Sequence, residues 1–128
     1  MFRLLSILAM CLPLISAARA QDAGDGERVF AACKLCHQVG EGAKSLAGPS
    51  LNGIVGRKAA AVTDYEYSPA NRDANITWTE AELTAFIANP KARLPGNKML
   101  YPGLRDDEKI ADVIAFLKQF DINGKKKR

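Results

Sequence analysis

The sequence predicts an all-α domain with short helices and long loops. Four segments carry helix signals, whereas the alternation of apolar and polar residues that is typical of strands is weak throughout. Loops as long as those between these segments are uncommon in a compact domain unless they pack on something other than protein. Removal of a short leader leaves 108 of the 128 residues, a size that fits one small domain.

The start of the chain is typical of a secretory signal peptide. Arg3 precedes an apolar run over residues 4–15, and small residues follow at 18–20. The run is well short of the roughly 20 residues that a membrane-spanning helix needs. We therefore expect cleavage before Gln21 rather than a retained anchor.

This leader comprises residues 1–20, and residues 21–128 form the expected domain. Cys11 allows a lipoprotein interpretation, but it lies inside the apolar run, so we assign it to the leader. The leader holds two arginines and no acid, so its removal lowers the formal net charge from +4 to +2. The basic tail at 125–128 supplies four positive charges, and we expect it to be a frayed, solvated end. The rest of the domain is not basic, which argues against nucleic-acid binding.

The first helix is expected over residues 22–33. Acidic residues lie early in this segment, and Val29, Phe30 and Cys33 follow at helical spacing. After it, the stretch 39–55 is a loop that must pass close to something bulky. The residues that suggest this are Gly40, Gly42, Gly48, Pro49 and Gly53.

Two further helices have clear start signals. Ser68 is an N-cap followed by a first-turn proline, which predicts a short helix to residue 73. Thr79 and Glu82 form a capping box that begins a second helix, and we expect Pro90 to end it after residue 89.

The last helix is expected over residues 106–120. Three acidic residues open it, at the end of the helix where negative charge is favourable. Behind them, an apolar stripe at helical spacing predicts a buried face. The stripe consists of Ile110, Val113, Ile114 and Leu117.

Residues 33–37, with the sequence CKLCH, have the spacing of a haem attachment site. Residues three apart on a helical turn project from one side, so both thiols can form thioether bonds with one edge of a porphyrin. The only histidine of the chain follows directly, and neutral imidazole is a good iron ligand. The sequence therefore predicts one haem c, attached through Cys33 and Cys36, with His37 on the iron.

The same cysteines allow two other interpretations. A disulfide or a redox dithiol uses this spacing too, but its thioredoxin-like form requires a βαβ context that the sequence does not contain. A structural zinc site usually needs four Cys or His ligands, and residues 21–128 offer three. The motif in an exported chain favours haem over both.

Met99 is the candidate for the second axial ligand. A methionine thioether raises the reduction potential of haem iron. Met99 is the only methionine of residues 21–128, and it follows Pro95 and Gly96 in a turn rather than on a helix stripe. The alternatives are a methionine that fills a gap in the core, and ligation by Lys98 in its place.

The chain resembles the class I small soluble cytochromes c, the mitochondrial cytochrome c and its bacterial periplasmic relatives, over almost all of residues 21–128. The segments that carry the resemblance are CKLCH at 33–37, GPSLNGIVGR at 48–57, YSPAN at 67–71, ITW at 76–78, NPKARLPGNKM at 89–99 and ADVIAFL at 111–117. The resemblance implies the class I fold, in which short helices and long loops wrap one covalently bound haem.

The resemblance also implies roles for individual residues. The carbonyl of Pro49 would accept a hydrogen bond from His37, which fixes the tautomer of the ligand. Asn71 would help to hold an internal water on the methionine side. The residues that would hydrogen-bond a buried haem propionate, directly or through water, are Arg57, Tyr67 and Trp78. Ordinary core packing is the alternative for the aromatic residues.

Two helices are expected to approach closely, because the resemblance places Gly26 and Phe30 against Val113 and Phe116. The chain departs from the family at two positions beside the iron. Asn97 stands where the family often has threonine, and Phe86 where it often has tyrosine. We therefore do not assign this protein a particular reduction potential on the basis of the resemblance.

The expected function is one-electron transfer, because two protein ligands leave no open site for a substrate. A cleavable leader points to the bacterial periplasm, where the partners would be a quinol-oxidising cytochrome complex, a terminal oxidase or a photosynthetic reaction centre. The alternatives are a haem peroxidase or gas sensor with a labile sixth ligand, and a thiol oxidoreductase. We expect a monomer without a small-molecule substrate. The basic residues expected around the haem edge are Lys34, Lys44, Lys58, Lys91, Arg93 and Lys98.

Overall fold

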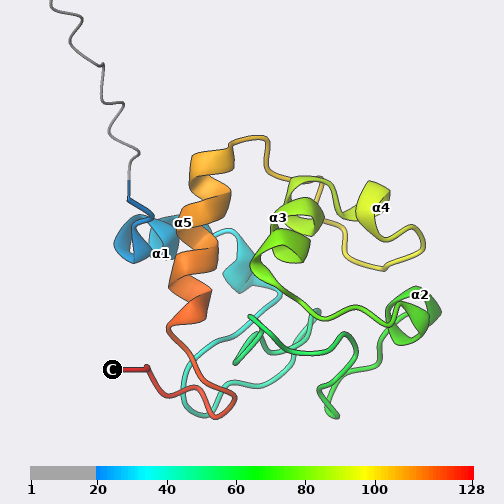
Figure 1. Cartoon of the computed structure of the whole chain (residues 1–128). Coiled ribbons are helices and arrows are strands. Elements are labelled where there is room, and N and C mark those ends of the chain that lie inside the picture. Colours follow the sequence, from blue (N-terminus) through cyan, green and yellow to red (C-terminus); the bar gives the residue numbers. More distant parts are fainter. Residues whose placement is uncertain (1–19) are drawn as a thin grey trace, which may run out of the picture.

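The computed structural model describes residues 20–128, so nearly all of the expected leader, including Cys11, lies outside the described residues. Helices and loops make up this part of the chain, and it contains two isolated β-bridges but no strand (Figure 1). The elements are α1 (Ala23–Phe30), η1 (Cys33–Leu35), α2 (Pro69–Asp73), α3 (Glu80–Ala88), α4 (Pro90–Arg93) and α5 (Asp107–Lys118). The all-α prediction is confirmed, and no helix of residues 20–128 is long and apolar enough to cross a membrane.

Helices α1 and α5 pack against each other at the left of Figure 1 and form one side of the core. Gly26 makes this possible, because a Cβ atom there would lie 1.9 Å from the carbonyl oxygen of Asp112. The rings of Phe30 and Phe116 meet beside it with centroids 5.2 Å apart. The close approach of these helices is therefore confirmed, although the nearest backbone belongs to Asp112 rather than to Val113.

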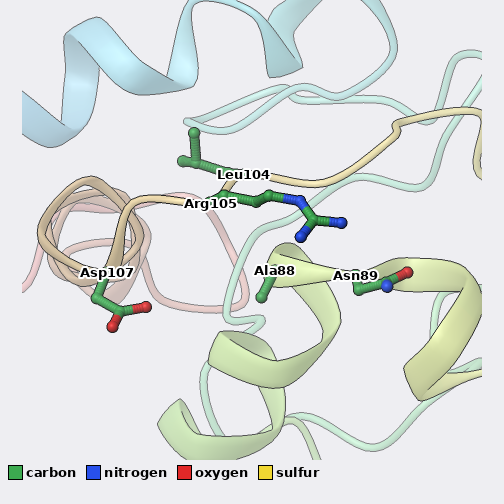
Figure 2. Close-up of a pocket in the computed structure, with 5 residues that line it drawn as sticks. All are labelled: Ala88, Asn89, Leu104, Arg105 and Asp107. Carbon is green, nitrogen blue, oxygen red and sulfur yellow. The ribbon is translucent and has the colours of Figure 1, made fainter.

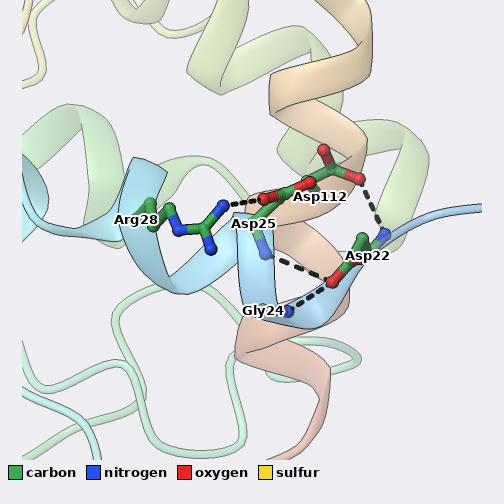
Figure 3. A network of polar contacts seen from close by, with 5 residues as sticks. All are labelled: Asp22, Gly24, Asp25, Arg28 and Asp112. Carbon is green, nitrogen blue, oxygen red and sulfur yellow. Dashed lines mark hydrogen bonds and ion pairs between the residues drawn. The ribbon is translucent and has the colours of Figure 1, made fainter.

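The start of α1 is tied to α5 by a polar network, which Figure 3 shows. The side chain of Asp22 caps α1 by accepting hydrogen bonds from Gly24 N at 2.7 Å and Asp25 N at 3.2 Å. The backbone N–H of Asp22 donates to the carboxylate of Asp112 at 2.8 Å. Asp112 is only 6% exposed, so this bond partly satisfies a buried carboxylate and fixes the register of the two helices.

The caps predicted for the middle helices are present. The hydroxyl of Ser68 accepts from Asn71 N at the start of α2, and that of Thr79 accepts from Glu82 N at the start of α3. Helix α3 packs against α5, and its Leu83 is buried in the same core. Predicted helix ends agree with the observed ones within two residues, except that the first helix ends at Phe30 and a separate 3₁₀ turn carries the cysteines.

Pro90 does end α3, but it also begins a helix that the sequence analysis did not predict. Asn89 is the N-cap of α4, and its side-chain oxygen accepts a hydrogen bond from Ala92 N at 3.2 Å. Proline is favoured at the first position of a helix because its missing N–H would have no partner there anyway. The side chain of Pro90 is fully buried, so α4 is anchored to the core at its first residue.

The basic tail differs from the frayed end that we expected. Its side chains are exposed, but Lys126 forms an antiparallel bridge with Phe120, and Lys127 N donates to Gln119 O at 2.7 Å. Upstream, the buried Gly124 packs on the carbonyl group of Gly40. The C-terminal segment therefore folds back and braces the loop that follows the cysteines.

Candidate functional site

The two cysteines lie on one turn that the backbone closes. Helix η1 begins at Cys33, whose carbonyl accepts from Cys36 N at 3.1 Å and from His37 N at 2.9 Å. Both thiols are free, and Cys36 is exposed. Burial, and to a lesser extent the neighbouring Cys36, raise the pKa of the Cys33 thiol. The turn thus presents two unpaired thiols and an imidazole within five residues.

His37 is held in one tautomer and in one place. Its Nδ1 lies 2.7 Å from the carbonyl oxygen of Pro49, and because a carbonyl only accepts, Nδ1 carries the proton. Burial lowers the pKa of the imidazole, an effect that the Pro49 hydrogen bond opposes. The neutral ring therefore keeps a lone pair on Nε2, which is the form that binds a metal.

Gly48 contributes to the same site from the other side of the ring. A Cβ atom at this position would lie 2.4 Å from Cε1 of His37, so only glycine allows the backbone to pass here. The N–H of Gly48 donates to Cys36 O at 2.9 Å, and Leu51 N donates to Gln38 O at 3.0 Å. Residues 48–51 are thus hydrogen-bonded to residues 36–38, the segment that contains His37. Its glycines suggested a bulky neighbour, and the closest one is His37 itself.

Arg57 is half-buried, with part of its hydrogen-bonding capacity unused. Its Nη1 donates to Ser50 O at 3.0 Å and to Asn52 O at 2.8 Å. Its Nε is buried without a partner, and within residues 20–128 it is the only such side-chain polar atom. Burial lowers the pKa of the guanidinium. A half-buried cation whose buried Nε–H lacks an acceptor is suited to an acidic group that the protein itself does not supply.

The residues predicted beside Arg57 are in its neighbourhood. Trp78 N donates to Arg57 O at 2.8 Å, and the indole is 7% exposed. Burial raises the pKa of the Tyr67 hydroxyl, and the positive charge of Arg57 acts against that shift. The Tyr67 oxygen also accepts a hydrogen bond from Val62 N at 3.4 Å. These residues therefore form one partly polar corner of the site.

Two other predicted residues have ordinary structural contacts. Asn71 is half-buried, and its backbone N–H and side-chain NH₂ both face the hydroxyl of Ser68, at 3.2 and 3.5 Å. Phe86 packs its ring on Trp78 with centroids 5.0 Å apart. Phe86 therefore packs as a core residue, and it lacks the hydroxyl of the tyrosine that the family often has at this position.

Met99 is half-buried at the end of a tight turn. The residues around it lie near the cysteines: Lys98 Nζ lies 4.9 Å from the ring centroid of Tyr65, and the charge of Cys36 adds to the effect of burial in raising the pKa of the Tyr65 hydroxyl. Similarly, burial and then the charge of Cys33 raise the pKa of Tyr101. Tyr101, two residues after Met99, therefore lies within electrostatic reach of Cys33, although Met99 follows His37 by 62 residues in the sequence.

Asn97 was noticed in the sequence only as a departure from the family, but it has a function in this loop. Its side chain bonds two carbonyl groups upstream and the N–H of Met99 downstream. The position of an asparagine directly after a Pro-Gly pair is a turn signal, but the sequence did not indicate which groups it would bond.

Two surface depressions lie wholly or partly outside this site. Figure 2 shows one at the end of α3 and the start of α5, which contains no cysteine, histidine or methionine and none of the predicted site residues. Its lining consists of Ala88, Asn89, Leu104, Arg105 and Asp107. A second depression reaches His37 and the side chains of Phe30 and Lys34. Within residues 20–128 no three His, Cys, Asp or Glu side chains gather in a way that could hold a metal ion alone.

The chemistry of these residues fits a haem c. Two free thiols lie on one turn, a neutral imidazole is oriented beside them, and a half-buried guanidinium has a buried Nε–H available for a carboxylate. No group of the described residues accepts a hydrogen bond from the Nε–H of Arg57, whereas a haem propionate could accept one. The candidate ligands of the iron are His37 and Met99.

Comparison with known proteins agrees with this fit. The sequence model of the cytochrome c family matches residues 23–121. Cytochrome c2 of Blastochloris viridis is 46% identical over 88% of this chain and 89% of its own length. Cytochrome c-554 of Methylosinus trichosporium is 48% identical over 97% and 96%.

Solved structures show the same relationship. Cytochrome cH from Methylobacterium extorquens has a TM-score of 0.72 and 43% identity, over 77% of this chain and 98% of its own. Cytochrome c2 from Rhodospirillum centenum has a TM-score of 0.74 and 34% identity, over 78% and 98%. The family carries haem c on a CXXCH motif, which this chain has at residues 33–37. The chain belongs to the cytochrome c family.

Proposed function

We propose that this cytochrome c is a monohaem, one-electron carrier of the bacterial periplasm. When haem is bound, its iron supplies the electron chemistry by alternating between the ferrous and ferric states. The observation that carries the proposal is the orientation of His37, whose Nδ1 is fixed at 2.7 Å from Pro49 O while Nε2 is free for iron. A ligand held in this way moves little when the charge on the iron changes.

The protein residues would divide the work of holding the haem. Cys33 and Cys36 would form the two thioether bonds, and His37 and Met99 would be the axial ligands. Support for Met99 comes from its neighbours on the chain, since Lys98 is engaged over the ring of Tyr65 rather than left free as a rival ligand.

The polar corner around Arg57 would receive a haem propionate. The unpartnered Nε of Arg57 supports this assignment, and Tyr67 and Trp78 would complete the set of donors. A propionate there would give the half-buried guanidinium a partner of opposite charge and its Nε–H an acceptor. Asn71 would hold an internal water on the methionine side.

A carrier and an enzyme differ in whether the sixth position on the iron is open. With Met99 bound, the site offers no position for peroxide or a gas, so we propose that the chain is not an enzyme. A ferric form that binds added cyanide only slowly and weakly, and a ferrous form that ignores carbon monoxide, would support the carrier. Prompt binding of either would support the peroxidase or gas sensor.

The Met99→Ala variant tests the ligand assignment. It should retain covalent haem, bind cyanide readily and have a lower midpoint potential, because thioether sulfur favours the ferrous state. Mass spectrometry of the purified variant controls for haem content. A variant whose spectrum and potential equal those of the parent would show that Met99 is not the ligand.

The partners that we propose are membrane redox complexes: a quinol-oxidising cytochrome complex, a terminal oxidase or a photosynthetic reaction centre. Contact with them would be brief and steered by charge. The candidate lysines are exposed, whereas Arg93 is half-buried in an ion pair with Glu82 and is a weaker candidate. The lysines are Lys34, Lys44, Lys58, Lys91 and Lys98. The leader at 1–20 would direct the chain to the periplasm, and the remaining domain would act as a monomer.

A further inference from the structure

We infer that Asn97 is a positioning residue that fixes the backbone at Met99 and thereby controls how readily the sixth ligand of the iron is displaced. The inference rests on the proposed role of Met99. It is carried by three hydrogen bonds of one side chain, which join the first residue and the C-cap of α4 to the residue that would bind the iron.

The loop before Met99 is built on a buried anchor. Pro90 is fully buried and Leu94, at the end of α4, is 8% exposed. Residues 94–97 then form a tight turn in which Asn97 N donates to Leu94 O at 3.2 Å. Gly96 takes a φ of 85°, which is the conformation that a turn with proline before glycine requires. The turn brings Asn97 back over the end of α4.

The side chain of Asn97 then uses both ends of its amide. Its NH₂ group donates to Pro90 O at 2.9 Å and to Leu94 O at 2.7 Å. Its oxygen accepts from Met99 N at 2.9 Å. The orientation of the amide follows from its partners, because two carbonyls need donors and one N–H needs an acceptor. One half-buried side chain thus binds the loop on both sides of the turn.

No other side chain of this size can make the same set of bonds. Aspartate has the same shape but no donor, and it would place a negative oxygen against two carbonyl groups. Threonine, which the family often has here, carries one hydroxyl that can donate to only one acceptor. Asparagine therefore secures this loop more firmly than the common residue does.

Displacement of a ligand requires the loop to open first. An external ligand binds only the open form, so its apparent affinity falls with the fraction of molecules that are open. Each hydrogen bond contributes a factor of about 5.5 to the equilibrium between the closed and the open loop, so the loss of two should raise the open fraction about 30-fold. The effect should appear in the ferric state, in which thioether sulfur is the weaker ligand.

The experiment measures the dissociation constant of cyanide for the ferric holoprotein in the parent and in Asn97→Asp. We expect cyanide to bind about 30-fold more tightly in Asn97→Asp, and about fivefold more tightly in Asn97→Thr, which keeps one donor. The matched control is Asn89→Asp, since Asn89 uses only its side-chain oxygen, toward Ala92 N, and aspartate is an equally good N-cap. This control should bind cyanide as the parent does.

The possible results distinguish an error in the role of Asn97 from an error in the assignment of Met99 as the ligand. Unchanged cyanide affinity in Asn97→Asp and Asn97→Thr would overturn the role of Asn97, even if their thermal midpoints fall, because a lower midpoint alone indicates a purely structural residue. An equal change in Asn89→Asp would overturn it as well. Met99→Ala is the calibration: if it fails to open the site to cyanide, the proposed ligand is wrong rather than the role of Asn97.

Discussion

Replacement of Gly26 by alanine should destabilise the domain strongly. The new Cβ would lie 1.9 Å from Asp112 O and 2.6 Å from its carbonyl carbon, so α1 and α5 would have to separate by more than about 1 Å. Because the obstacle is backbone, no side chain can rotate away, and the steric cost should reach about 3 to 4 kcal/mol. Alanine regains about 1 kcal/mol of helix propensity. We therefore expect a net loss of about 2 to 3 kcal/mol in the free energy of unfolding.

The matched control is Gly24→Ala, two residues earlier on the same helix. A Cβ at Gly24 meets only the carboxylate oxygen of Asp22, at 3.1 Å, so this variant should stay within about 1 kcal/mol of the parent. The assay is guanidinium unfolding of the ferric holoproteins, followed by circular dichroism. The reasoning is refuted if Gly26→Ala unfolds with the same free energy as the parent, or if both alanines cost the same.

Two further predictions concern charge. The Ser45 hydroxyl and N–H hold the pKa of Asp64 below its usual value, so Asp64 stabilises the fold above about pH 4 and loses that effect as the pH falls through its lowered pKa. The stability gap between the parent and Asp64→Asn, measured by unfolding at each pH, should therefore close below pH 4, and a constant gap would contradict this. Electron transfer to a membrane redox partner should slow as salt rises. Lys98→Gln should weaken this dependence, and a rate that ignores ionic strength would reject the lysine patch.

Local signals predicted most of the fold. Asp106, Thr79 and Ser68 each cap a helix where the sequence analysis placed the start of one. These caps depend on residues three apart, which a sequence displays directly. Helix α4 was missed because Pro90 was considered only as the end of the preceding helix, although Asn89 before Pro90 is also a start signal.

Other features depend on groups far apart in the chain. The packing of Gly124 on Gly40 places the C-terminal segment against a loop 84 residues earlier, and a bridge from Lys126 to Phe120 holds the charged end beside the last helix. Composition predicts a solvated tail there, and its side chains are exposed, but it does not predict the backbone pairing. The spare donor of Arg57 is equally invisible in the sequence, because it depends on which carbonyls lie nearby.

The packing of Gly48 and Pro49 against His37 also has a consequence for the order in which the new polypeptide folds. Gly48 and Pro49, which enclose the imidazole, come after the CXXCH segment in the chain. In a polypeptide that crosses a membrane N-terminus first, Cys33, Cys36 and His37 therefore emerge before the Gly48-Pro49 segment that packs on the imidazole. If haem is attached during this interval, a substitution that speeds the folding of residues 45–51 onto His37 should lower the yield of haem-containing protein without changing the folded holoprotein.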